Sequence, residues 1–89
     1  MTDKQKAIDL GFTKAAIYKI VVQGELDVAW CERLWGLQAN VKREKGEKPI
    51  TTIIGQINDQ SALSGILTTL NDMHISVISV NLLSEIEYD

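Results

Sequence analysis

The feature that most constrains the fold is the order in which strand-like and helix-like patterns follow one another. Residues 16–26, "AIYKIVVQGEL", are rich in β-branched and aromatic residues and predict a strand. Alternation directs one set of its side chains to the core, namely Tyr18, Ile20, Val22, Gly24 and Leu26. Residues 37–43 and 50–57 predict two more strands, joined by the turn signal "EKGEKP" into a hairpin. A fourth strand is expected at residues 74–83.

Two segments between these strands space their apolar side chains by three and four residues, as amphipathic helices do. Residues 27–36, "DVAWCERLWG", predict a short helix with Asp27 as its N-cap and a glycine at its end. Residues 59–73 predict a longer helix, capped by Asp59 or Asn58. The predicted order is strand, helix, strand, strand, helix, strand.

This order is that of the split βαβ arrangement, so we expect an α+β, ferredoxin-like βαββαβ fold. Its four-stranded antiparallel sheet would have the order 4-1-3-2, with two helices on one face, because right-handed crossovers place the first and third strands in the centre. An 89-residue chain has room for one core. We expect one domain at residues 16–83, a flexible or partner-dependent arm at residues 1–15 and an acidic tail at residues 84–89.

Composition argues against several classes of protein and of site. The net charge of −3 gives no general attraction to nucleic acid or anionic lipid. No apolar run approaches the ~20 residues that span a bilayer, so we expect a cytoplasmic protein without nucleic-acid or membrane partners. Cys31 is the only cysteine and His74 the only histidine. An internal disulfide is therefore impossible, and we expect no metal site.

No constellation of residues identifies a reaction, so we expect no enzyme, no catalytic residue and no cofactor. The carboxylates of Asp27 and Asp59 would lie at opposite ends of the sheet, on the order of 20 Å apart, and are predicted to be N-caps rather than an acid–base pair. Cys31 is predicted to be a small buried residue of the first helix. The stretch "GQINDQSALSG" lacks the second glycine and the lysine of phosphate-binding loops.

Two glycines of the predicted central strands suggest a gap above the sheet. Gly24 and Gly55 fall on the inward-facing sets, where a missing side chain leaves room. Either Trp30 or Trp35 fills that room by close helix packing, or the four residues line a pocket for a small ligand.

The face away from the helices is expected to carry an apolar patch, made of Ile17, Val21, Ile54 and Val77. We predict that this patch is a homodimer interface, since a two-fold pairing of sheet faces covers it without another partner. In the competing interpretation the arm or the tail folds over it within one chain, through Ile8, Leu10 and Phe12 or through Ile86 and Tyr88.

Two resemblances accompany these patterns. The stretches "YKIVVQGELDVAW", "TTIIGQINDQSALSGILTTL" and "SVISV" resemble a group of small bacterial proteins without an assigned function. The segment "GQINDQSALSGILTTLNDMHISVISV" is similar to the strand, Asp, helix and strand unit of the ACT domain, and this resemblance implies sensing of an amino-acid-like ligand. We therefore predict a non-catalytic, self-associating interaction module, with small-molecule sensing as the alternative.

Overall fold

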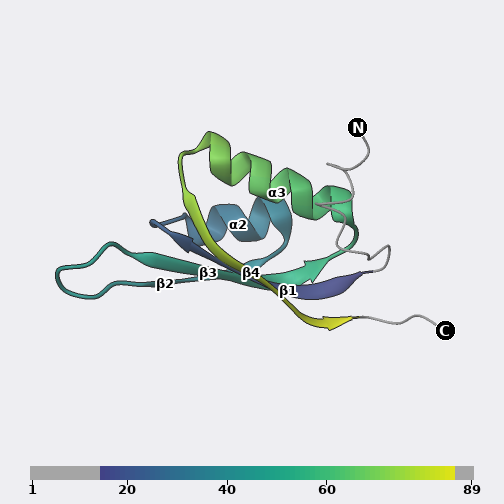
Figure 1. Cartoon of the computed structure of the whole chain (residues 1–89), viewed down its shortest axis with the longest axis horizontal. Coiled ribbons are helices and arrows are strands. Elements are labelled where there is room, and N and C mark those ends of the chain that lie inside the picture. The colour runs from purple at the N-terminus through teal and green to yellow at the C-terminus, as the bar shows by residue number, and fades with distance from the viewer. Residues whose placement is uncertain (1–14, 86–89) are drawn as a thin grey trace.

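The computed structural model describes residues 15–85 and contains the six predicted elements in the predicted order (Figure 1). They are β1 (Ala16–Gln23), α2 (Val28–Trp35), β2 (Gln38–Lys42), β3 (Ile50–Ile57), α3 (Gln60–Asp72) and β4 (Ser76–Glu85). The predicted tail begins too early, because β4 continues through Glu85. The predicted arm, apart from Ala15, and residues 86–89 of the predicted tail lie outside the described residues.

The sheet has the order β2-β3-β1-β4, and all three strand pairings are antiparallel. Read from the other edge this is the order 4-1-3-2, so the predicted ferredoxin-like α+β fold is confirmed. Figure 1 shows α2 and α3 on the same side of the sheet. Within residues 15–85, the sheet therefore has one face covered by helices and one open face.

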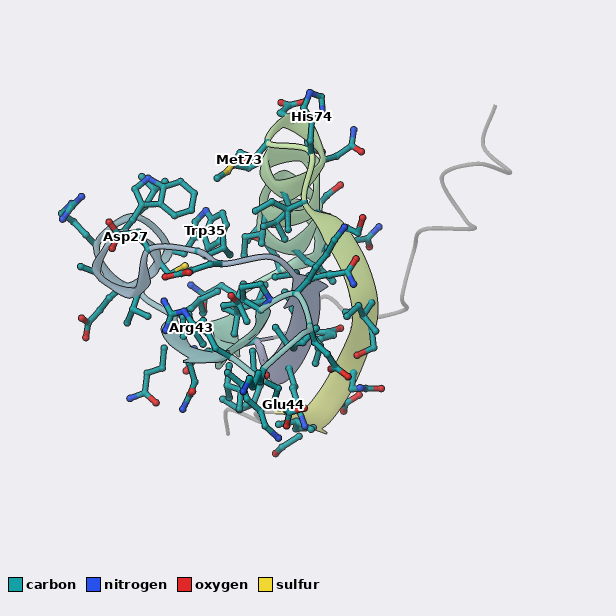
Figure 2. The ribbon with its side chains drawn as sticks, turned by 90° about the vertical axis from the view of Figure 1, so that its left-hand side faces the viewer. Asp27, Trp35, Arg43, Glu44, Met73 and His74 are labelled. Carbon is teal, nitrogen blue, oxygen red and sulfur yellow. The ribbon has the colours of Figure 1, made fainter. Side chains whose placement is uncertain are left out.

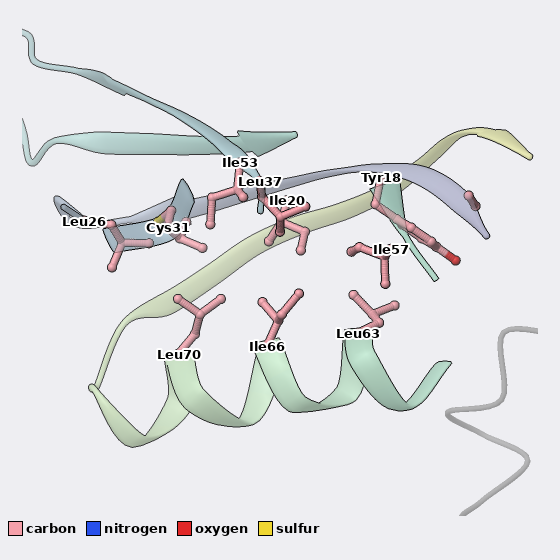
Figure 3. Packing of buried hydrophobic residues seen from close by; sticks show 12 residues of the cluster. Tyr18, Ile20, Leu26, Cys31, Leu37, Ile53, Ile57, Leu63, Ile66 and Leu70 are labelled. Carbon is pink, nitrogen blue, oxygen red and sulfur yellow. The ribbon is translucent and has the colours of Figure 1, made fainter. Parts of the chain in front are cut away.

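The core lies between the helix-covered face and the two helices. The inward set of β1 is buried, as are the apolar side chains that α3 presents to the sheet at three- and four-residue spacing (Figure 3). The cluster includes Ala16, Tyr18, Ile20, Val22, Ile53, Ile57, Leu63, Ile66 and Leu70. The alternate side chains of the strands and the apolar stripe of the helices pack together in this one layer. This packing determines which face of every strand remains open.

Strand β1 ends three residues earlier than predicted, at Gln23. Gly24 has a φ of 128°, a conformation that side-chain-bearing residues rarely adopt, so the strand turns there. The backbone N–H of Gly24 donates to the carbonyl of Pro49 at 2.8 Å. Leu26 then returns to the core with 3% of its surface exposed.

Strand β4 departs from regular alternation at two places. Its register with β1 shifts between Val77 and Ser79 and again between Leu82 and Ser84. Each shift inserts one extra residue, so that two residues of β4 oppose one of β1, as in a β-bulge.

No helix among the described residues is long and apolar enough to cross a membrane.

Candidate interaction surface

The two aspartates at the strand-to-helix junctions act as helix N-caps. An Oδ1 atom of Asp27 accepts a hydrogen bond from the backbone N–H of Trp30 at 3.1 Å, and Oδ1 of Asp59 accepts one from Ala62 at 2.8 Å. Each carboxylate satisfies a donor that the first helical turn leaves unpaired. The prediction that both residues are caps is therefore confirmed.

Cys31 is fully buried on the inner side of α2, as predicted. Burial raises the pKa of its thiol, and the nearby carboxylate of Asp27 raises it further. A thiol that keeps its proton is a poor nucleophile, because the thiolate is the reactive form.

His74 lies exposed in the turn after α3, with a φ of 61°. Within residues 15–85, His, Cys, Asp and Glu side chains form no group of three or more that could hold a metal ion.

The gap above Gly55 is filled, but by a residue that the sequence assigned to a strand. A Cβ atom at Gly55 would lie 2.5 Å from Cδ2 and 3.3 Å from Cα of Leu37. Leu37 reaches this place because Gly36 ends α2 with a left-handed φ of 70° and turns the chain back over the sheet. The position above Gly55 is thus a packing contact.

The four residues predicted to line a pocket are not gathered in one place. Gly24 lies just beyond the end of the β1–β3 pair that is farther from Gly55. The side-chain atom nearest to its Cβ position is Cδ1 of Ile75, at 3.9 Å. Trp30 and Trp35 instead contact each other edge to face, with ring centroids 4.9 Å apart.

Trp35 also lines a groove of about 470 Å³. The other residues of that groove are Leu34, Leu37, Gln56, Ile57, Asn58, Ala62, Gly65, Ile66 and Thr69.

One buried polar residue was missed by reasoning from the sequence. Thr51 is fully buried, and its Oγ1 accepts a hydrogen bond from the backbone N–H of Leu26 at 3.2 Å. The same hydroxyl donates to the carbonyl of Gly24 at 2.6 Å. The signal in the sequence was a hydroxyl residue on the inward set of a strand, opposite a glycine turn. The two hydrogen bonds of Thr51 fix the loop that leads into α2.

The open face carries three of the four residues predicted as an interface. Ile17 and Val21 flank Lys19 on β1, and Ile54 pairs with Lys19 across the sheet, so the three aliphatic side chains surround one lysine. Ile54 is 38% exposed, and Ile17 and Val21 are half-buried. No helix of the described part of the chain lies over this face in Figure 1.

The fourth predicted residue, Val77, requires a correction. Val77 pairs with Val22, whose side chain faces the helices, so the register assigns Val77 to the helix-covered face. The prediction failed because it assumed unbroken alternation along the strand, which the two shifts interrupt. The shifts instead place the pairs Ile78–Ser79 and Leu83–Ser84 opposite open-face residues of β1.

Exposed apolar side chains concentrate on β4. Among residues 15–85, four of the eight large apolar side chains that stay exposed belong to this strand, and they are Val77, Ile78, Leu82 and Leu83. Figure 2 shows β4 along one side of the molecule, with Asp27 and Trp35 of the α2 region on the other. As the outermost strand of the described sheet, β4 has β1 as its neighbour on one side and no described strand on the other. The run "VISVNLL" did not show on which faces these side chains lie.

The charged side chains gather at the far edge of the sheet. Arg43 forms an ion pair with Glu25, and Lys42 forms one with Glu44 at 3.3 Å. All four side chains are largely exposed, so these pairs contribute little to stability. The β2 edge is thus charged, whereas β4 has one charged residue, Glu85, and four exposed apolar side chains.

The chain matches a known family of domains. The model of a domain of unknown function, DUF8691, matches residues 17–81, which include every helix and strand described above except the ends of β1 and β4. No curated protein and no solved structure is significantly similar to the chain.

Proposed function

Because the chain belongs to the DUF8691 family, whose domain has no known function, we propose a function from its surface: it is a non-catalytic interaction module that self-associates into a homodimer. The observation that carries this proposal is the exposed apolar surface of β4 and of the adjoining open face. Removing such surface from water is favourable by about 25 cal/mol per Å². A second copy of the chain offers a matching apolar surface without any other partner.

Two parts of this surface support the proposal. The open face has Ile17, Val21 and Ile54, three of the four residues that the sequence predicts as an interface, with Lys19 among them. The β4 edge has four exposed apolar side chains and only one charged residue, Glu85. Clusters of exposed apolar side chains are typical of interaction sites rather than of free surface.

Sedimentation velocity tests the proposal. Over concentrations from about 1 to 100 µM, a range in which moderately stable dimers assemble, we expect a species of twice the 9.9 kDa chain mass. The species should shift toward the monomer on dilution, because association depends on concentration. A chain that sediments as a monomer throughout this range would overturn the proposal.

The groove beside Trp35 favours a second candidate function, the sensing of a small molecule. Its apolar wall and the polar side chains of Gln56, Asn58 and Thr69 are the mixture typical of small-molecule sites. The resemblance to ACT domains would make the ligand amino-acid-like. Native mass spectrometry of protein taken directly from cells measures subunit number and retained small molecules in one spectrum. A dimer without added mass would support the interaction module, and a bound small molecule would support sensing.

A further inference from the structure

We infer that β4 pairs edge to edge with β4 of a second copy, antiparallel, in a register whose two-fold axis passes through Asn81. This inference rests on the proposed self-association and assigns it a contact. Five features of the strand lead to it: its position, its lack of positive charge, its faces, its two bulges and the place of its one acidic residue.

The two edges of the sheet differ in how well they would accept another strand. An edge strand presents unpaired backbone N–H and C=O groups, and native proteins commonly protect such edges with short strands and charged side chains. Strand β2 fits this description, since it spans Gln38–Lys42 and is followed by Arg43, Glu44 and Lys45. Strand β4 has 10 residues and no positive charge. Among the edges that the described residues form, the β4 edge is therefore the one open to pairing.

The faces of β4 restrict the possible registers. Pairing with β1 shows which residues of β4 face the helices, namely Val77, Val80, Leu82 and Glu85, and which face the open side, namely Ser79, Asn81 and Ser84. Directly opposed residues of an antiparallel pair lie on the same face. When Asn81 opposes its own copy, Val80 opposes Leu82 and Val77 opposes Glu85, so each pair shares a face. A slip of one residue opposes Val80 to Asn81, which lie on different faces.

The two bulges select the same register. The pairs Ile78–Ser79 and Leu83–Ser84 are the places where two residues of β4 oppose one of β1. A bulged strand bends locally. About Asn81, the pair Ile78–Ser79 of one copy lies opposite Leu83–Ser84 of the other, so the bends of the two strands coincide. A pairing centred on Val80 would set each bend against a differently shaped part of the partner strand.

The side chains of this register are chemically compatible. The carboxylates of the two copies of Glu85 lie at opposite ends of the paired segment, each facing Val77, so no like charges are opposed. On the helix side Val80 packs against Leu82 of the copy, which is 43% exposed in the isolated chain. On the axis, the carboxamide of Asn81 can both donate to and accept from its own copy. The described residues of the two copies would then form a continuous eight-stranded sheet with four helices on one face.

Cysteine cross-linking tests the register. Opposed Cα atoms of an antiparallel pair are about 4.5 to 5.5 Å apart, within the range that a disulfide can bridge. Asn81→Cys is therefore expected to give a covalent dimer on mild oxidation of the full chain at micromolar concentration. Wild-type protein should give none, since its only cysteine, Cys31, is fully buried.

Ser79→Cys is the matched control, because it lies on the same face of the same strand. In the inferred register it opposes Leu83, so its own copy is four residues away, roughly 13 Å. We expect at least tenfold less covalent dimer from Ser79→Cys than from Asn81→Cys. Adding Leu83→Cys to Ser79→Cys should restore the cross-link. Equal cross-linking of Asn81→Cys and Ser79→Cys would overturn the register.

Sedimentation of the wild-type chain separates this inference from the proposed function. If the wild-type chain is a dimer and Asn81→Cys does not cross-link, the edge contact is wrong and self-association stands. A monomeric wild-type chain that gives no cross-link would remove both.

Discussion

At the residue scale, Leu37 packs directly over Gly55 in the core. The strand position has no side chain, and Leu37 occupies the volume that one would fill. Leu37 itself is 1% exposed and is held by the end of α2 on one side and β2 on the other. Because its Cα as well as its Cδ2 lies close to the glycine, a rotamer change alone cannot make room.

Gly55→Ala is therefore expected to lower the free energy of unfolding by about 1 to 3 kcal/mol through overpacking. The matched control is Gly65→Ala, in the middle of α3, where nothing lies within 4 Å of the Cβ position. That change should raise stability by about 0.5 to 1 kcal/mol, because alanine favours the helix. Urea denaturation measures both. An unchanged midpoint for Gly55→Ala would show that the backbone at Leu37 moves away easily.

At the scale of elements, each helix is fixed at its start by one aspartate. The sequence left two candidates for the cap of α3, and the structure selects Asp59, whose carboxylate reaches Ala62. Asn58 instead accepts a hydrogen bond from the side chain of Gln56 at 2.9 Å, outside the helix. The two neighbouring polar residues thus have different roles.

Asp59→Ala is expected to cost about 1 kcal/mol of folding free energy, because one backbone N–H of the first helical turn loses its partner. Asn58→Ala should change stability by less than about 0.5 kcal/mol, as exposed substitutions usually do. Thermal unfolding followed by circular dichroism compares the two. A larger loss for Asn58→Ala than for Asp59→Ala would contradict this assignment of the cap.

The elements also show how far the sequence predicts this structure. Alternation, helical spacing and the capping aspartates were sufficient for the order of elements, the sheet topology and the buried set of β1. They failed where an extra residue breaks the alternation, since a bulge in β4 has no signature in a run such as "VISVNLL". They also failed at Leu37, whose place above Gly55 depends on the approach of two distant segments. The exposed apolar side chains of β4 were missed because these bulges interrupt the alternation.

At the scale of the whole molecule, the acidic groups of two buried side chains link folding to pH. Burial raises the pKa of the Tyr18 phenol, and the charge of Glu85 raises it further. Burial also raises the pKa of the Cys31 thiol, with a smaller contribution from Asp27. In the unfolded chain both groups ionise at their ordinary values. In alkaline solution the unfolded state therefore binds fewer protons than the folded state, and folding weakens as pH rises.

The free energy of unfolding is accordingly expected to include the full contribution of these groups below about pH 8 and to lose it progressively above about pH 8.5. Urea denaturation between pH 7 and 10 measures this fall. Cys31→Ala removes the group that ionises first, so its loss of stability between pH 8 and 9.5 should be smaller than that of the wild type. Stability that rises with pH over this interval would contradict the direction of both pKa shifts.

The central position of β1 has a consequence for how the chain reaches its fold. This strand comes before every other described element, yet Ala16 pairs with Ile57 on one side and with Glu85 on the other. Synthesis runs from the N-terminus. The side of β1 that pairs with β4 therefore stays unpaired until the chain has been extended to residue 85. Such distant pairings slow folding, because long loops must close before the contacts form. A growing chain therefore exposes the backbone of its central strand until residue 85 has been synthesised, and at high local concentration the β4 segment of a neighbouring chain can pair with it first, which exchanges a strand between two molecules.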